Sequence, residues 1–160
     1  MPDTALGLAS EGDVRNACAA IVASLGNHPM DGFLVMPMRE PATELIVGVA
    51  NAPGWGLVLA VGFGGILTEI RADTSLRRLP VDRADVHEML GELEGSAILD
   101  GVRGREPVER EALVDAVLAI ADAASFVGEK LEALEVNPLV VDGNRIEALD
   151  ALVSWRTDPV

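Results

Sequence analysis

Three oxygen-bearing side chains flank one predicted hairpin near the end of the sequence, ALEVNPLVVDGNRIEALDA. Glu135 and Asn137 precede its Asp-Gly pair (142–143), and Asp150 follows that pair. Glu135 and Asn137 are two residues apart in a strand, so they share a face. An antiparallel register can set Asp150 beside Asn137. Such oxygen ligands suit Mg²⁺, with waters and phosphates completing its shell. Spacing alone leaves a second interpretation open, that of solvated polar residues at strand ends.

The elements that position this hairpin are predicted from hydrophobic periodicity and turn residues. Helices are expected where caps precede a 3.6-residue apolar period, over 10–26, 82–93 and 107–126. The first is expected to begin at Ser10 and to end at Gly26, with an apolar stripe on one face. The second is expected to be capped by Asp82 and to turn Val86, Met89, Leu90 and Leu93 inward. The short apolar runs outside these helices predict strands. They are 4–9, 32–38, 43–50, 57–63, 66–70, 74–80 and the two arms of the hairpin. Consecutive strands with short turns indicate antiparallel pairing. The fold class is therefore α+β, an antiparallel sheet flanked by helices, in a single domain over 1–160.

Composition excludes several classes of partner. The chain has 160 residues, 49% hydrophobic, and a net charge of −14. This charge argues against binding to nucleic acid and to anionic membrane surfaces, because both need clustered Lys and Arg. A bound Mg²⁺ would still allow a nucleotide. The single cysteine, Cys18, excludes an intramolecular disulfide, and no signal peptide is visible, so we expect a reducing cytoplasm.

A glycine-rich segment, GFGG, occupies 62–65. Gly62, Gly64 and Gly65 would let backbone N–H groups approach an anion closely. The spacing matches neither the P-loop nor the dinucleotide-binding pattern. A tight turn between two strands is the alternative interpretation.

Several charged residues could serve a site or could simply be solvated. Glu44 begins a predicted strand and could face either water or a pocket. Arginines bind phosphate through a bidentate guanidinium, although most surface arginines form only weak ion pairs. The other residues weighed in this way are Glu69, Asp73, Arg71, Arg77, Arg78 and Arg103. His28 and His87 have no visible catalytic partner and are expected at the surface.

Motifs in family order along residues 5–151 resemble the ATP-grasp domain of NDP-forming acyl-CoA synthetases, which also resembles the succinyl-CoA synthetase β subunit. They are GFLVMPM, ATELIVGV, GWGLVLAVGFGGILTEIRAD, LRRLP, DGVRGREP and EVNPLVV…ALDA. The resemblance implies that Asn137 and Asp150 bind magnesium with ATP or ADP, and that Glu135 supports them or is a further ligand. It also implies that Glu44 binds the ribose and that the GFGG segment lies near the phosphates.

The same resemblance makes Arg78 and Arg103 the best candidates for phosphate contacts. It further implies that this chain corresponds to the second, C-terminal lobe of an ATP-grasp unit. The first lobe carries a phosphate-binding lysine and a relay histidine, and neither has a match here. The only lysine is Lys130, and ANAP (50–53) replaces the family's T-R-D-P turn.

We therefore expect residues 1–160 alone not to be a competent ligase. Joined to a first lobe and CoA-binding domains, in the same or another chain, they would form part of an ADP-forming acid–CoA ligase. An incomplete site would leave an apolar face, which favours homo- or hetero-oligomers. The alternative function is a non-catalytic binding or assembly module that kept the lobe's fold.

Overall fold

The computed structural model describes residues 4–39, 42–64, 73–102 and 106–156. The chain forms two compact units, residues 1–41 and residues 42–160. Within the described part, no helix is long and apolar enough to cross a bilayer.

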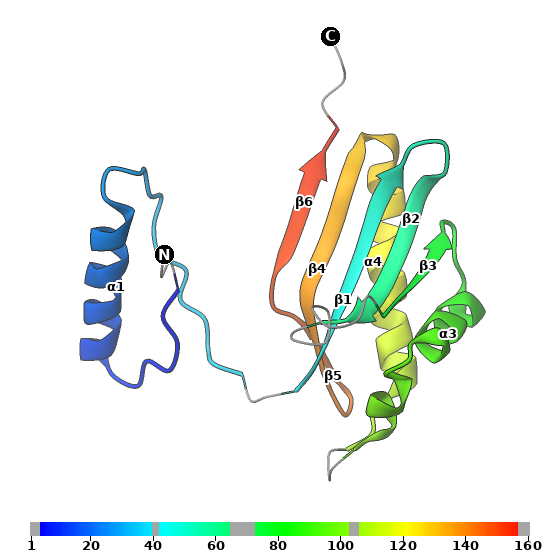
Figure 1. The fold of residues 1–160 in the computed structure, drawn as a ribbon, viewed down its shortest axis with the longest axis horizontal. Coiled ribbons are helices and arrows are strands. Elements are labelled where there is room, and N and C mark those ends of the chain that lie inside the picture. The colour runs from blue at the N-terminus through cyan, green and yellow to red at the C-terminus, as the bar shows by residue number, and fades with distance from the viewer. Residues whose placement is uncertain (1–3, 40–41, 65–72, 103–105, 157–160) are drawn as a thin grey trace. The chain divides into compact units, whose positions relative to one another are not determined.

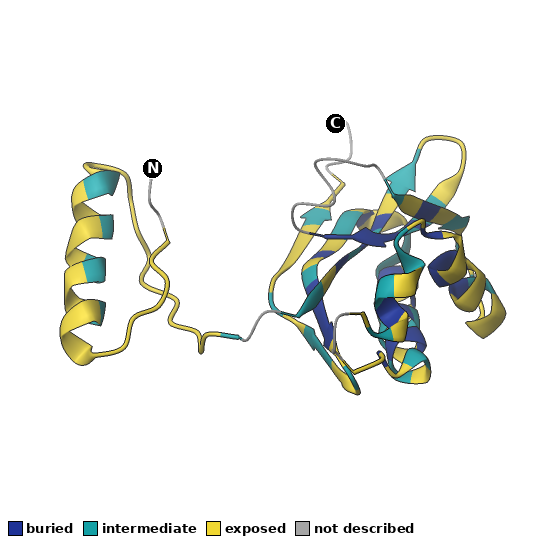
Figure 2. Cartoon of the chain, turned by 60° about the horizontal axis from the view of Figure 1, so that its bottom comes forward, coloured by how far each residue is buried: buried dark blue, intermediate teal, exposed yellow. Residues whose placement is uncertain are grey.

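The first unit contains one helix, α1 (Glu11–Leu25), and extended chain on both sides of it. Ser10 caps the helix as predicted, because its side chain accepts a hydrogen bond from the Asp13 N–H, and Gly26 ends it. None of the helix residues is buried, so the predicted apolar stripe is at most half-covered within this unit (Figure 2).

The strands predicted over 4–9 and 32–38 are wrong, because the structure has no strand in either segment. Strand formation requires a partner backbone, and the described residues of this unit supply none. The apolar side chains of 33–38 are accordingly exposed, with Leu34 at 87%. Apolar content alone therefore did not decide the structure of this segment.

The second unit is built on a six-stranded antiparallel sheet with the order β3-β2-β1-β4-β5, in which β6 also pairs with β4 (Figure 1). Its strands are β1 (Thr43–Ala52), β2 (Gly56–Phe63), β3 (Thr74–Arg78), β4 (Leu131–Asp142), β5 (Arg145–Ala148) and β6 (Ala151–Trp155). The predicted α+β class with an antiparallel sheet is confirmed. The predicted strand over 66–70 lies outside the described residues.

Two α-helices, α3 (Arg83–Glu92) and α4 (Arg110–Val127), cover one face of this sheet. Short 3-10 helices, η1 (Ser96–Asp100) and η2 (Gly128–Lys130), precede and follow α4. Asp82 caps α3 as predicted, and it forms a capping box with Asp85. The predicted inward face of α3 is confirmed, since Val86, Met89, Leu90 and Leu93 are all buried. α4 begins at Arg110 rather than near Pro107, because the Glu109 side chain caps the Ala112 N–H.

The C-terminal hairpin joins β4 to β5 through Gly143 and Asn144. Gly143 has a φ of +58°, the left-handed conformation that a tight hairpin turn requires and that glycine adopts without steric cost. Beyond β5 the chain continues in the same direction along the same edge of β4, so that β6 pairs with its first half. The long strand β4 therefore carries two short partners in succession.

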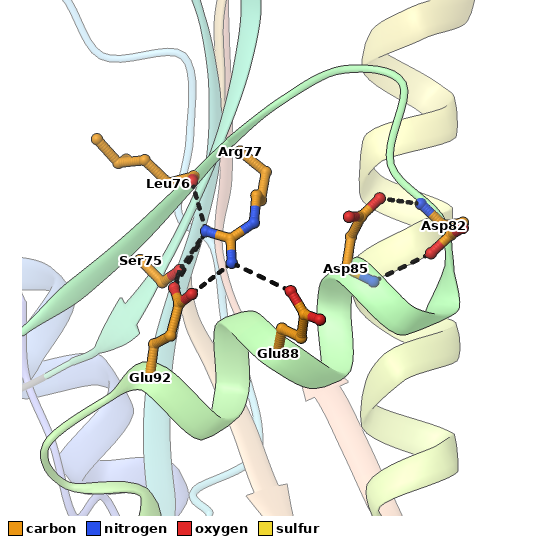
Figure 3. A network of polar contacts seen from close by, with 7 residues as sticks. All are labelled: Ser75, Leu76, Arg77, Asp82, Asp85, Glu88 and Glu92. Atoms are coloured by element: carbon orange, nitrogen blue, oxygen red, sulfur yellow. Dashed lines mark hydrogen bonds and ion pairs between the residues drawn. The ribbon is translucent and has the colours of Figure 1, made fainter.

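A polar network joins β3 to α3 (Figure 3). The Arg77 guanidinium forms an ion pair with Glu92 and donates a hydrogen bond of 3.0 Å to the Leu76 carbonyl. Ser75 donates to the same Glu92 carboxylate at 2.5 Å. Glu88 lies farther away, 3.7 Å from Arg77. These contacts hold the edge strand β3 against the helix layer.

The segment after α3 is held by Asp73, whose carboxylate accepts hydrogen bonds of 2.9 Å from the N–H groups of Glu94 and Gly95. Gly95 lies directly against the buried ring of Phe63, where an added Cβ would come within 2.8 Å of Cε2. The absence of a side chain at Gly95 is thus a packing requirement.

Substituting Gly95→Ala is expected to destabilise the fold by about 1–3 kcal/mol, because the methyl group would overpack a buried ring. The matched control is Gly91→Ala in α3, where an added Cβ meets nothing within 4 Å. This control should gain roughly 0.5–1 kcal/mol from helix propensity. Urea unfolding measures both, and equal stabilities of the two variants would contradict the packing argument.

Glu92 is expected to make stability depend on acid. Its hydrogen bond with Arg77, and then that with Ser75, lowers the pKa of this carboxyl below the ordinary value of 4.5. A lowered folded-state pKa adds stability above the unfolded pKa, and this stability is lost as pH falls through the folded value. In Glu92→Gln, the melting temperature should therefore drop by a few degrees near neutral pH and vary less below about pH 4.5. Glu88→Gln affects a longer contact, so it should change the melting temperature and its dependence on pH less.

Candidate functional site

One face of the sheet in residues 42–160 is turned away from α3 and α4, and we call it the open face. In β1, the side chains of Leu45, Val47 and Val49 are buried against the helices. Because side chains alternate along a strand, Glu44 and the even-numbered residues that follow it lie on the open face. No described helix of this unit covers that face (Figure 1).

Cross-strand partners share a face, so the register extends the open face to the other strands. Glu135 of β4 pairs with Gly48 of β1. In β2 and β3, Gly62 pairs with Thr74 and Val58 pairs with Arg78. Since Ile46 of β1 is the partner of Gly62, these residues also lie on the open face.

The structure brings the three predicted metal ligands together at one edge of the open face. Asn137 Nδ2 donates a hydrogen bond of 3.0 Å to Glu135 Oε1. The Asn137 backbone N–H donates to the Asp150 carbonyl at 3.1 Å, which makes these two residues neighbours across the strand pair. All three side chains are exposed. The antiparallel neighbourhood predicted for Asn137 and Asp150 is confirmed.

A bulge presents Asn137 at this place. Leu45 pairs with Leu139 and Val47 pairs with Val136, so β4 uses one more residue than β1 between these pairs. The extra residue falls at Asn137 and Pro138, opposite Ile46. Bulges redirect side chains near functional sites, and here the bulge lies between the two halves of β4 that pair with β5 and β6.

The donor atoms suit a hard divalent cation. Because its Nδ2 group donates to Glu135, the Asn137 amide leaves Oδ1 as a ligand. Asp150 Oδ1 accepts the Ala151 N–H at 2.8 Å, which leaves its second oxygen. In the part of the chain that the structure describes, no three His, Cys, Asp or Glu side chains form a metal-binding group. These residues fit magnesium only as part of a shell that water and phosphate oxygens complete.

Glu44 lies at the start of β1 and is exposed on the open face. Its carbonyl accepts the Gly64 N–H at 2.8 Å, and an added Cβ on Gly64 would lie 3.3 Å from its Cβ. The partner of Glu135, Gly48, is four residues farther along β1, about 13 Å away at the usual strand rise. Glu44 and Glu135 are therefore too far apart to contact the same small group.

Gly62 lies within β2 rather than in a turn, in the cross-strand row that also holds Asn137, Ile46 and Thr74. An added Cβ there would come within 2.8 Å of the Asp73 carbonyl oxygen. The close packing of β3 against β2 is therefore sufficient to explain a glycine at this position, and no bound ligand is needed to explain it. Gly65 lies outside the described residues.

Arg78 is exposed on the open face but lies away from the hairpin ligands. It is four residues along β3 from Thr74, about 13 Å, and β3 is three strands from β4, about 14 Å. The structure does not bring it beside Asn137. The other predicted phosphate-binding arginine, Arg103, lies outside the described residues.

The remaining polar residues weighed from sequence have structural partners or are at the surface. Asp73 holds the backbone after α3, and Arg77 is paired with Glu92. The exposed ring of His87 contacts Glu111 at 2.9 Å, and His28 is exposed, so both histidines lie at the surface as predicted. Glu69 and Arg71 lie outside the described residues.

Sequence reasoning missed three residues of the open face. Thr74 and Leu76 lie there beside Gly62 and Ala60, and Leu152 is the partner of Glu135. Leu76 and Leu152 are 58% and 65% exposed. The alternation of TSLRR would have placed Thr74, Leu76 and Arg78 on one face. Leu152 had no such signal, because its pairing depends on the return of the chain along β4.

Comparison with known proteins shows the family to which this architecture belongs. Residues 4–154 match the ATP-grasp domain family. The β subunit of acetate–CoA ligase [ADP-forming] II from Pyrococcus furiosus is 34% identical over 110 residues, 69% of this chain and 47% of that protein. Acetate–CoA ligase [ADP-forming] I from Archaeoglobus fulgidus is 33% identical over 150 residues, 91% of this chain and 21% of that protein. The chain thus spans about half or less of these two relatives.

A solved structure has the same fold. It is the Ca. Korarchaeum cryptofilum dinucleotide forming acetyl-coenzyme A synthetase 1, in complex with coenzyme A and Mg-AMPPCP. The TM-score is 0.81 with 30% sequence identity, over 95% of this chain and 67% of that chain. The chain is therefore similar to the nucleotide-binding portion of NDP-forming acyl-CoA synthetases, and the resemblance inferred from its motifs is confirmed. This protein belongs to the ATP-grasp domain family.

Proposed function

We propose that this chain is the lobe of an NDP-forming acyl-CoA synthetase that binds ATP or ADP with magnesium. The observation that carries the proposal is the open face, on which Glu135 and Asn137 lie beside Asp150 at the sheet edge, with Glu44 farther along β1. An antiparallel sheet normally covers its apolar face and solvates the other. Here the solvated face carries a cluster of oxygen ligands at a bulge, together with a further carboxylate about 13 Å along the strand.

In this proposal, Asn137 Oδ1 and an Asp150 oxygen bind magnesium, and Glu135 orients the Asn137 amide or is a further ligand. Glu44 accepts hydrogen bonds from the ribose. Gly62, Gly64 and Gly65 line the phosphate side, and Arg78 and Arg103 contribute charge to the phosphates. The magnesium ion would neutralise phosphate charge when bound, which a chain with a net charge of −14 does not do by itself.

The relatives extend the proposal to partners. Some are named as β subunits, and this chain matches only a fifth of the length of others. We infer that the nucleotide site is completed by a first ATP-grasp lobe and that CoA-binding domains lie elsewhere, in the same or another chain. The complete assembly would interconvert an acyl-CoA, ADP and phosphate with the acid, CoA and ATP. Two further statements remain predictions: that the protein is cytoplasmic, and that residues 1–160 form a single domain.

Substituting Asp150→Asn or Asn137→Ala should weaken magnesium-dependent ADP binding by about tenfold or more, because each removes or weakens an oxygen ligand. Both side chains are exposed, so the fold should survive. Calorimetric titration with ADP, with and without magnesium, measures this effect. The control Asp122→Asn removes the same charge from an exposed position of α4 and should bind like the parent chain. Magnesium-dependent affinity that is equal in all four proteins would refute the ligand assignment.

The ribose contact of Glu44 has a separate test. Glu44→Ala should weaken ADP binding by about tenfold, the size expected for a lost hydrogen bond to a charged group. With 2′,3′-dideoxy-ADP as ligand, the same substitution should have little effect, because the hydroxyl partners are absent. A penalty of the same size for both nucleotides would show that Glu44 acts through the fold or through charge rather than through the ribose.

A further inference from the structure

The outer edge of β6 is an exposed strand edge with an apolar sequence. β6 pairs with β4, and no other described strand pairs with it. Its five residues, ALVSW, carry no charge, and the side chains of Leu152, Val153 and Trp155 are 65%, 40% and 58% exposed. Edges of this kind are usually protected by charged residues, proline or a bulge, because they are templates for pairing with another strand.

The hydrogen bonds to β4 show which backbone groups of β6 point outward. The Arg156 N–H donates to the Lys130 carbonyl at 2.9 Å, and the Asp150 carbonyl accepts from Asn137. These even-numbered residues direct their backbone groups toward β4. Since the direction alternates along a strand, Ala151, Val153 and Trp155 direct theirs to the outer edge.

A second copy of the chain can pair with this edge in an antiparallel arrangement, and one register fits better than the registers next to it. With Val153 on the two-fold axis, Val153 pairs with itself and Ala151 pairs with Trp155 of the other copy. All three outward-pointing residues then find outward-pointing partners. Shifting the axis by one residue in either direction leaves one of the three opposite a residue outside β6, so this register gives the most complete ladder.

The same register matches the charges that flank the strand. Asp150 of one copy lies opposite Arg156 of the other, and the two-fold axis repeats this pair. Opposite charges directly across an antiparallel pair stabilise it, and like charges would oppose it. The chain's net charge of −14 repels a second copy at long range. At about 0.15 M salt, that repulsion is screened beyond about 8 Å, whereas contacts at the edge persist.

We propose that β6 is a self-association surface through which two copies join their sheets edge to edge, with Val153 on the two-fold axis. The symmetric contact is isologous and closes as a dimer. A five-residue ladder is short, so the dimer forms and dissociates with concentration. The ladder forms along the backbone edge, so the inference does not rest on the proposed function, although one flanking charge, Asp150, is also a proposed magnesium ligand.

Analytical ultracentrifugation of the full 160-residue chain across the micromolar range tests this proposal. The average mass should rise from that of the monomer toward twice that value. Val153→Pro removes an outward N–H while keeping the inward bonds to β4, and it should remain monomeric throughout. Val153→Thr keeps the N–H group and the β-branched shape and should still dimerise. A parent chain that stays monomeric, or a folded Val153→Pro that dimerises, overturns the proposal.

Charge reversal tests the register independently and does not depend on proline being tolerated. Arg156→Glu sets a carboxylate opposite Asp150 and should weaken the dimer about tenfold or more, whereas adding Asp150→Lys to the same chain should restore it. Circular dichroism checks that each variant keeps the parent's sheet. Failure of the double variant to recover the mass of the dimer would exclude this register, even if another part of the protein associates.

Discussion

The burial of one face of the sheet against α3 and α4 is the constraint on which the rest of residues 42–160 depends. Leu45, Val47 and Val49 alternate into that core, and fully buried residues of both helices meet them. Burial of such side chains contributes about 1.5–3 kcal/mol each, so the register of β1 is strongly specified. Because the strand period is two, the same packing places Glu44 and the residues that follow it on the opposite face.

The grouping of Glu135, Asn137 and Asp150 depends on this constraint and on one irregularity. Without a bulge, β4 would pair with β1 in a regular ladder, and nothing in that ladder would favour a projecting polar side chain at the middle of the strand. The extra residue at Asn137 and Pro138 interrupts the ladder, and after the hairpin the chain returns along β4 as β5 and then β6. The return brings Asp150 to Asn137. Two acidic positions and an amide thus meet where neither β5 nor β6 continues the pairing.

Two glycines proposed to line the phosphate side also have a structural reason for lacking a side chain. Gly62 is required by the close approach of Asp73, and Gly64 packs against Glu44. Both glycines are buried, and the absence of a side chain lets neighbouring backbone approach closely at each position. Substitution at these glycines would therefore disturb packing as well as any ligand, which makes Asp150 and Glu44 the clearer tests of function.

The sequence by itself determined the α+β class, the caps of α1 and α3, the buried face of α3 and the Asp-Gly hairpin. All of these depend on local propensity or periodicity. It also predicted that Asn137 and Asp150 would be neighbours, because a tight turn sets the register of the strands beside it. The ordered motifs further indicated the ATP-grasp family, which the match over 4–154 confirmed.

Only the tertiary structure decided which runs became strands and where the long-range partners lie. Residues 32–38 have an apolar strand-like sequence, yet they find no partner backbone among the described residues of their unit, so they stay unpaired and exposed. Asp73 and Arg77 were candidate site residues, but their partners, Gly95 and Glu92, lie 22 and 15 residues away. Arg78 shares the open face with Asn137 but is three strands from it. Such distances depend on how strands stack into a sheet, which local sequence does not encode.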